Sequence, residues 1–190
     1  MFNLIEKLIN LHHQVKYDSY RNKYKIHPTF RFNGKGIVFY KDGEIICREN
    51  SYTGEFSSVQ AYPGCKVIIC KNCRISHFVQ IYTQTAIADS DFSKDIPIKI
   101  GDVVIGDNCW IGAKVFINPG IKIEKNCVVG AHSVVTKDLP PHPICVGVPC
   151  KVIKFKSYLS EKEKRMLAKK FENSLSEQLK MEFNIRSKIR

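Results

Sequence analysis

The stretch "IGDNCWIGAKVFINPGIKIEKNCVVGAHSVVTKDLP", residues 105–140, divides into consecutive groups of six residues. Each group begins with an aliphatic residue, at positions 105, 111, 117, 123, 129 and 135. A six-residue period is typical of a parallel β-helix, in which each hexad contributes a short strand and a corner. Three hexads make one coil of about 18 residues, and successive coils stack at the ~4.8 Å spacing of paired strands. The sequence therefore predicts a mainly β fold.

Asparagines in the fourth place of a hexad extend this phase toward the N-terminus. Asparagine suits a sharp corner because it tolerates a left-handed backbone. Four asparagines, Asn50, Asn72, Asn108 and Asn126, are separated by 22, 36 and 18 residues. We interpret the first interval as a coil with a small bulge at 61–64. We interpret the second as a coil plus an excursion over residues 83–104, with an extra regular coil as the alternative.

Stacking the hexads predicts which side chains share a face. If coils begin at 47, 69, 105 and 123, the fifth-place cysteines point inward and are structural; they are Cys73, Cys109 and Cys127. The third-place residues of the middle hexads point outward and form one column, made of Glu55, His77, Ala113 and Ala131.

This column suggests a site. The two alanines leave a shallow groove for a slender ligand that ends at His77. Glu55, one coil away, is expected to accept the other ring N–H and to raise the basicity of the imidazole. The alternative is that His77 packs at a subunit contact.

The flanking segments have helical patterns. Residues 2–20 have apolar residues at helical spacing, and "SEKE" at 160–163 fits a capping box. A helical stripe follows it, made of Leu167, Phe171, Leu175 and Leu179. We expect an N-terminal helical segment (1–28), a β-helix domain (29–155) and a C-terminal basic amphipathic helix (156–190).

Composition narrows the function. The formal net charge is +12, and residues 151–190 carry twelve Lys and Arg against five Glu. Such a tail can bind nucleic acid, an anionic membrane or a phosphorylated ligand, or be a solvated helix; it lacks the interleaved aromatics of nucleic-acid binding. No segment is apolar enough to span a bilayer and no export signal is evident, so we expect a cytoplasmic protein whose eight cysteines are thiols. The "CKNC" at 70–73 has no second ligand pair, so we expect no metal.

Residues 105–155, with "VVTKDLPP" at 134–141 and "GVPCKVI" at 147–153, resemble the left-handed β-helix acyltransferases with hexapeptide repeats. The pattern is closest to galactoside, maltose and polysaccharide O-acetyltransferases. The resemblance implies a left-handed helix, a homotrimer, and acetyl-CoA lying between neighbouring prisms. By motif position, Trp110 is the tryptophan beside the active site. The residues implied to contact acetyl-CoA are Ala113, Ala131, Thr136, Lys137, Lys151 and Lys154, the last two replacing basic residues near its phosphates.

One position departs from this pattern. The catalytic histidine of galactoside acetyltransferases falls on Ala86, and residues 83–104 contain no histidine. However, "ISHFV" at 75–79 resembles the catalytic "LDHAT" of serine acetyltransferases and the "ISH…IYT" stretch of sugar acyltransferases. The resemblance therefore supports His77 as the general base.

These observations predict an acetyl-CoA-dependent acetyltransferase that modifies a hydroxyl, or an amine, of a sugar in surface polysaccharide biosynthesis. Asp89 and Asp91 are the expected ligands of the acceptor, a sugar or nucleotide sugar. The alternatives are a nucleotide-amino-sugar N-acyltransferase, a non-catalytic trimeric scaffold, and a zinc enzyme like the γ-carbonic anhydrases. The last needs three converging histidines, whereas His77 and His132 occupy different hexad places. A peripheral membrane contact of the N-terminal helix is left open.

Overall fold

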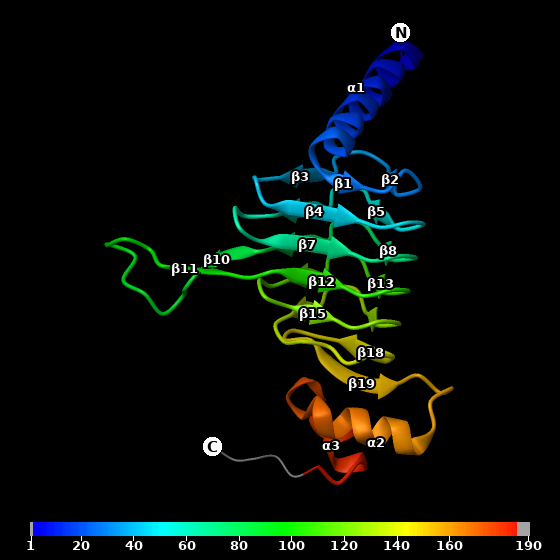
Figure 1. Ribbon diagram of the computed structural model, residues 1–190, viewed down its shortest axis with the longest axis vertical. Helices are drawn as coiled ribbons and strands as arrows, with labels where there is room; N and C mark the ends of the chain where they lie inside the picture. Colours follow the sequence, from blue (N-terminus) through cyan, green and yellow to red (C-terminus); the bar gives the residue numbers. More distant parts are fainter. Residues whose placement is uncertain (1, 186–190) are drawn as a thin grey trace.

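The computed structural model describes residues 2–185, and residues 25–135 form five stacked coils of a parallel β-helix (Figure 1). The first three coils contain β1 (Lys25–Ile26), β2 (Arg31–Asn33), β3 (Val38–Tyr40); β4 (Glu44–Cys47), β5 (Tyr52–Gly54), β6 (Ser58–Gln60); and β7 (Lys66–Ile69), β8 (Arg74–Ile75), β9 (Gln80–Tyr82). The next two contain β12 (Val103–Ile105), β13 (Trp110–Ile111), β14 (Phe116–Ile117); and β15 (Lys122–Ile123), β16 (Val128–Val129), β17 (Val134–Val135). An antiparallel pair, β18 (Pro143–Val146) and β19 (Lys151–Phe155), continues the second face.

The predicted stacking of the hexads is confirmed. Ile75 pairs with Ile111, and Ile111 pairs with Val129, along the second face. The Ile69–Ile105 and Ile81–Ile117 pairs join the third and fourth coils directly. Residues between these coils therefore form an excursion and not an additional coil.

The first coil was not recognised in the sequence. Its β1 lies within the segment expected to be helical (1–28), and the helix α1 (Phe2–Lys23) ends before it. Phe32 and Phe39 occupy inward positions that pair with Thr53 and Val59, but they are seven positions apart in the sequence, whereas Thr53 and Val59 are six apart. The six-residue period is broken here, and glycines at positive φ occupy the corner, so the sequence pattern did not reveal this coil.

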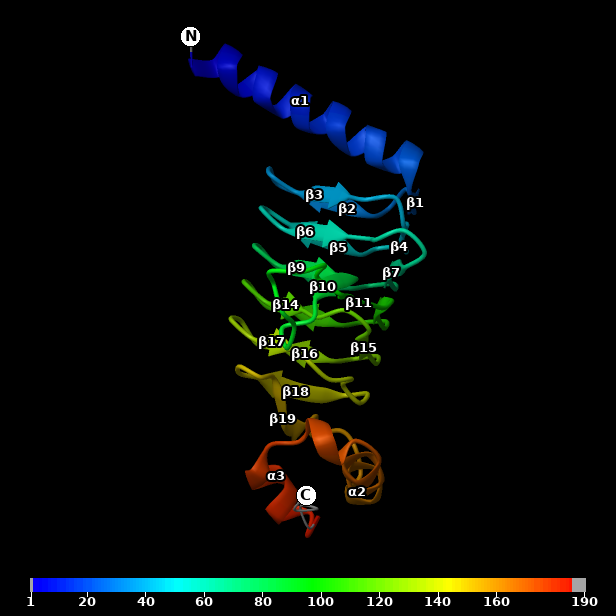
Figure 2. The same ribbon diagram turned by 90° about the vertical axis from the view of Figure 1, so that its left-hand side faces the viewer.

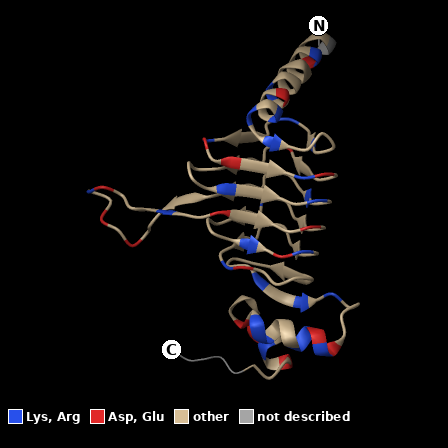
Figure 3. Cartoon of the chain, viewed as in Figure 1, with Lys and Arg blue, Asp and Glu red and all other residues tan. Residues whose placement is uncertain are grey.

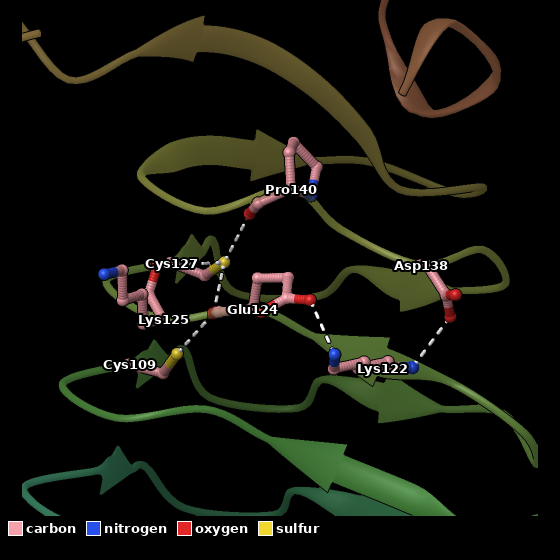
Figure 4. A network of polar contacts seen from close by, with 7 residues as sticks. All are labelled: Cys109, Lys122, Glu124, Lys125, Cys127, Asp138 and Pro140. Carbon is pink, nitrogen blue, oxygen red and sulfur yellow. Dashed lines mark hydrogen bonds and ion pairs between the residues drawn. The ribbon is translucent and has the colours of Figure 1, made fainter. Parts of the chain in front are cut away.

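The corners and the interior follow the predicted hexad places. Asn50, Asn72, Asn108 and Asn126 have φ angles of 57° to 59°, the left-handed conformation expected of a fourth-place residue. Cys109 and Cys127 are buried, and their thiols donate to the carbonyl oxygens of Glu124 (3.1 Å) and Pro140 (3.0 Å) (Figure 4). Burial raises the pKa of Cys127, which keeps this thiol protonated and agrees with its structural interpretation.

Helix α1 covers the open end of the first coil. Tyr17 Oη donates to Gly34 O (2.7 Å), Arg21 Nη2 to Phe30 O (2.6 Å), and Tyr24 Oη to Lys41 O (2.8 Å). These side chains satisfy carbonyl groups that have no strand above them. The helix also projects beyond the stack (Figure 2), with exposed apolar side chains from Leu4 to Val15.

The predicted C-terminal helix is present, but it does not continue through the whole leucine stripe. The segment contains α2 (Glu161–Lys170), a 3₁₀ turn at Glu172–Ser174, and α3 (Glu177–Glu182). Leu175 is extended because it forms a parallel bridge with Val152, and Ser176 caps α3 through Leu179 N. The predicted capping box at Ser160 and Glu163 is confirmed.

The charge of the described C-terminal segment is mixed. Acidic and basic residues alternate in the first turn of α2 and both occur on α3 (Figure 3), with ion pairs between Lys164 and Glu161 and between Lys180 and Glu177; the second half of α2 carries only basic charges. Residues 186–190 of the predicted basic helix lie outside the described part of the chain. Within residues 2–185 no helix is long and apolar enough to cross a membrane.

Candidate active site

The predicted column of third-place residues is present at the corner between the second and third faces. Phe78 N donates to Glu55 O (2.8 Å), Lys114 N to His77 O (2.9 Å), and His132 N to Ala113 O (2.9 Å). These backbone hydrogen bonds place Glu55, His77, Ala113 and Ala131 on successive coils. The column therefore brings an imidazole beside two methyl side chains.

The imidazole of His77 is exposed, and its Nδ1 accepts a hydrogen bond from the backbone N–H of Glu55 (3.1 Å). Because an amide N–H only donates, Nδ1 carries no proton in this arrangement, and the neutral ring holds its proton on Nε2. His77 therefore presents a donor at Nε2 in the single chain.

We expected the Glu55 carboxylate to accept a hydrogen bond from His77, but in the structure it is the backbone N–H of Glu55 that contacts the ring. Glu55 Oε1 instead accepts a long hydrogen bond from Lys35 N (3.4 Å), and the side chain lies against Gly34, where a Cβ would come within 2.0 Å of it. Because Gly34 has no side chain, the Glu55 side chain can extend toward the first coil. Glu55 orients the ring through its backbone.

The alanine positions are open because their side chains end at Cβ. A Cβ on Gly112 would lie 2.5 Å from Ala131 N, so the coils approach closely at this corner. Ala113 is half-buried and Ala131 is exposed. Together they form a shallow strip that leads away from His77 toward the C-terminal end.

Trp110 lies on the second face next to this column. Its indole Nε1 is 3.4 Å from Ser76 Oγ, and Ser76 directly precedes His77. The side chain is 54% exposed, too open for a corner-packing residue. Trp110 is therefore available to a ligand that approaches His77.

The remaining predicted acetyl-CoA residues lie at other places. Thr136 and Lys137 line a pocket of about 490 Å³ at the far edge of the third face, together with Lys99, Lys170 and Phe171. Lys151 donates to Asn173 O (3.2 Å), and burial, followed by repulsion from Lys137 and Lys180, lowers its pKa. Lys154 is exposed on β19 opposite Ile144.

Asp89 and Asp91 lie in the excursion. Its base is an antiparallel pair, β10 (Gln84–Ala86) and β11 (Ile98–Ile100), and its tip projects away from the prism (Figure 1). Asp91 accepts from Ser93 N (3.0 Å) and Ser93 Oγ (2.6 Å), which holds the pKa of its carboxyl below the usual value; Asp89 is exposed. A single chain does not bring these residues to His77.

Two features beside the site were missed in the sequence. Phe56 and Phe78, which follow Glu55 and His77, are half exposed and stacked at 5.1 Å, with φ angles of 55° and 57°. Bulky residues are rare in this conformation. The sequence did contain a sign of this pair, because both phenylalanines stand in the fourth hexad place, where asparagine is favoured.

Lys99 and Lys170 were also missed; they line the distant pocket that contains Lys137. They are far from it in the sequence, so no sequence pattern connects them with it.

Among residues 2–185, no three His, Cys, Asp or Glu side chains are grouped so that they could hold a metal ion. His77 and His132 stand two coils apart in the column of corners.

Comparisons with known proteins agree with this architecture. The family model "Bacterial transferase hexapeptide (six repeats)" matches residues 102–137. Galactoside O-acetyltransferase of Escherichia coli (strain K12) is 56% identical over 52 residues, which cover 27% of this chain and 26% of that protein. The chain thus spans about a quarter of the length of this curated relative.

Two solved structures are similar over more of the chain. A maltose O-acetyltransferase from Clostridium difficile 630 is 39% identical over 67% of this chain and 70% of that protein, with a TM-score of 0.46. The N-acyltransferase AntD from Bacillus cereus, solved with dTDP and coenzyme A, is 20% identical over 80% of this chain and 86% of that one, with a TM-score of 0.58. Residues 102–137 therefore carry the hexapeptide repeat of bacterial transferases, and the stacked parallel coils are the fold expected of that repeat.

Proposed function

We propose that this protein transfers an acetyl group from acetyl-CoA to a sugar hydroxyl, in the cytoplasmic biosynthesis of a surface polysaccharide, with His77 as general base. The observation that carries the proposal is the exposed imidazole of His77 at the end of the Ala113–Ala131 strip. The names of the relatives, galactoside and maltose O-acetyltransferases, support sugar as the acceptor class.

The reaction is a direct transfer. His77 takes the proton of the acceptor hydroxyl, the oxygen attacks the thioester carbonyl, and the imidazolium returns the proton to the departing thiolate of CoA. For this, Nε2 must be unprotonated, whereas in the resting chain Nδ1 accepts from Glu55 N–H. The ring must therefore move its proton to Nδ1 and turn away from that amide. The exposure of His77 permits the movement, and we include in the proposal that the Glu55 carboxylate then accepts a hydrogen bond from Nδ1–H.

Acetyl-CoA is proposed to follow the strip of Ala113 and Ala131. Thr136, Lys137, Lys151 and Lys154 are proposed to hold its polar parts. Because Thr136 lies at the opposite edge of the third face from Ala131, one chain cannot enclose the ligand with both sets. We therefore include a homotrimer in the proposal, in which the alanine strip of one prism faces the Thr136 pocket of the next.

The hairpin of a neighbouring subunit completes the acceptor site in the same proposal. It projects far enough to leave its own prism (Figure 1), and Asp89 then accepts hydrogen bonds from acceptor hydroxyls. Asp91 shapes the hairpin through its bonds to Ser93. Trp110 forms the wall of the site beside His77.

The test is release of CoA thiol from acetyl-CoA with a panel of sugars, amino sugars and nucleotide sugars. His77→Ala is expected to lower turnover by about 10²- to 10⁴-fold, the usual contribution of a general base, while acetyl-CoA still binds. His12→Ala, on the exposed part of α1, is the matched control. Near-normal turnover of His77→Ala would remove His77 as the base, and product on an amine alone would make the enzyme an N-acyltransferase.

A protein that binds acetyl-CoA but acetylates no member of the panel would not support this function. A protein that binds no acetyl-CoA at all would favour the non-catalytic scaffold. Mass spectrometry of the acceptor product separates O-acetylation from N-acetylation.

A further inference from the structure

A basic groove lies on the outer surface of the second face, the face that carries Trp110. It has a volume of about 590 Å³ and is lined by Arg31, Tyr52, Arg74, Trp110, Val128 and Lys156, with asparagines along one side. The groove crosses successive coils, because Arg31 pairs with Tyr52, Tyr52 with Arg74, and Arg74 with Trp110. It is separate from the Thr136 pocket, which lies at the edge of another face.

The positive charge of the groove is not neutralised. Within residues 2–185, Arg31, Arg74 and Lys156 form no ion pair, and no Asp or Glu lines the groove. Arg31 is positioned over the ring of Tyr52, at 5.6 Å from its centroid; this cation–π contact orients the guanidinium and leaves its net positive charge in the groove. Cations held in a concave surface attract a multiply charged anion such as a diphosphate.

Polar and aromatic groups stand beside these cations. Asn72 Nδ2 donates to Asn108 Oδ1 (3.1 Å), which leaves the amide hydrogens of Asn108 and the oxygen of Asn72 free for a ligand. The exposed ring of Trp110 offers a flat apolar surface. Amides that donate and accept, together with an aromatic surface, suit a base or a ribose. The lining as a whole suits a nucleoside diphosphate.

The groove leads to the proposed base. Trp110 belongs to its lining, and the contact of Trp110 Nε1 with Ser76 Oγ joins it to the residue before His77. A group attached to the diphosphate therefore extends toward the imidazole. We propose that the basic groove binds the nucleoside diphosphate of the acceptor, so that the acceptor is a nucleotide-activated sugar. This inference rests on the proposed function.

CoA also contains a nucleoside diphosphate, so the donor is a second possible source of the same chemistry. The positions proposed to hold its polar parts, Thr136 and Lys137, lie outside the groove. The groove is therefore assigned to the acceptor, and the experiment separates the two ligands.

The sequence contains one tryptophan, so fluorescence excited at a wavelength that tyrosine does not absorb reports on Trp110 alone. The full-length protein is titrated with dTDP, UDP and GDP, and separately with CoA. At least one of the three diphosphates is expected to change the fluorescence saturably. Arg74→Gln and Lys156→Gln should weaken its binding about tenfold or more, because each removes a charge-assisted contact. Arg48→Gln, at the same corner but outside the groove, is the matched control.

Circular dichroism establishes that each variant is folded, and calorimetry gives the affinity for CoA. An unchanged CoA affinity in Arg74→Gln supports the assignment. Absence of any fluorescence change with the three diphosphates at millimolar concentration would overturn it. It would also be overturned if Arg74→Gln weakened CoA and left the diphosphate unaffected.

These results do not depend on turnover. If His77→Ala keeps its activity while the diphosphate still binds in the groove, the proposed base is wrong and the groove assignment stands. If His77→Ala is inactive but no diphosphate binds, the acetyltransferase stands and the acceptor is not a nucleotide sugar.

Discussion

Single residues at the fourth hexad place determine the sharpness of the corners. At the first corner of successive coils this place holds Asn50, Asn72, Asn108 and Asn126, and then His142, whose φ is 66°. His142 N donates to Lys125 O (3.0 Å), so His142 continues the same column as the asparagines. Its imidazole adds a titrating group that asparagine does not have, half-buried beside Lys125 and Lys156, with Nδ1 2.7 Å from Tyr158 Oη.

The histidine at this corner, where the other coils have asparagine, makes the free energy of unfolding depend on pH. Burial, followed by the charges of Lys125 and Lys156, lowers the pKa of His142, although Glu163 acts weakly in the other direction. The unfolded chain therefore binds the proton first as pH falls below about 6.5, the ordinary pKa of histidine, and stability is lost over that range. We expect the melting temperature of His142→Asn, relative to wild type, to rise as the pH is lowered from 8 to 5.5. Parallel melting curves at all pH values would contradict this interpretation.

The strands are short elements that depend on their neighbours. β13 contains two residues, of which Ile111 is fully buried and paired on both sides with aliphatic residues. Strands of this length have little stability by themselves, so the packing of the stacked interior must stabilise the coil. The hairpin of β10 and β11 is different, because it lies outside the stack.

Ile111→Ala should therefore destabilise the protein by about 2–5 kcal/mol, the usual cost of removing a buried aliphatic side chain. Ile153→Ala, on β19 and 46% exposed, is the matched control and should cost far less. Urea unfolding followed by circular dichroism measures the difference. Equal losses in both variants would show that the interior is not the main source of stability.

The hairpin should be dispensable for folding. Ala86 and Ile98 are paired in antiparallel register, so a two-residue Asn-Gly turn can replace residues 87–97. We expect the melting temperature to change little, while KM for the acceptor rises and acetyl-CoA binding is retained. Unchanged acceptor kinetics would exclude Asp89 from the acceptor site.

At the scale of the whole molecule, the proposed site is divided between parts of the chain that lie apart. His77 is at the corner between the second and third faces, whereas the hairpin leaves the prism after β9, at the other edge of the third face. Rotational symmetry of an oligomer would bring the hairpin of one subunit to the corner of another. The homotrimer therefore predicts shared sites.

Shared sites are testable by mixing two proteins that each lack one part of the site. The assay uses a low acceptor concentration, at which the variant with the raised KM and the variant without the base are both nearly inactive alone. His77→Ala and the variant without residues 87–97 are unfolded together, refolded at equal amounts, and assayed. In a randomly mixed trimer about a quarter of the interfaces combine an intact His77 with an intact hairpin, so about a quarter of the wild-type activity is expected. No recovery of activity, with mixed trimers demonstrated by mass spectrometry, would place both parts of the site in one subunit.

The six-residue period made the last four of the five coils predictable: the aliphatic residues at 105, 111 and 117 each pair with the expected residue of the preceding coil. The first coil could not be found because its inward positions Phe32 and Phe39 break that period. The direction of the Glu55 side chain could not be predicted from the hexad spacing, because it depends on the free volume beside Gly34 on the neighbouring coil. The basic groove joins Arg31 to Lys156, and residues so distant in sequence meet only after the coils stack.

The cover that α1 places on the first coil bears on how the protein behaves at high concentration. A solenoid end is a row of unpaired strands, onto which another molecule can add its own last strand and begin a fibre. Tyr17, Arg21 and Tyr24 already occupy carbonyl groups directly beside those strands. The helix α1 therefore blocks end-to-end polymerisation at the first coil. The hexad repeat by itself sets no limit to the number of coils that can stack.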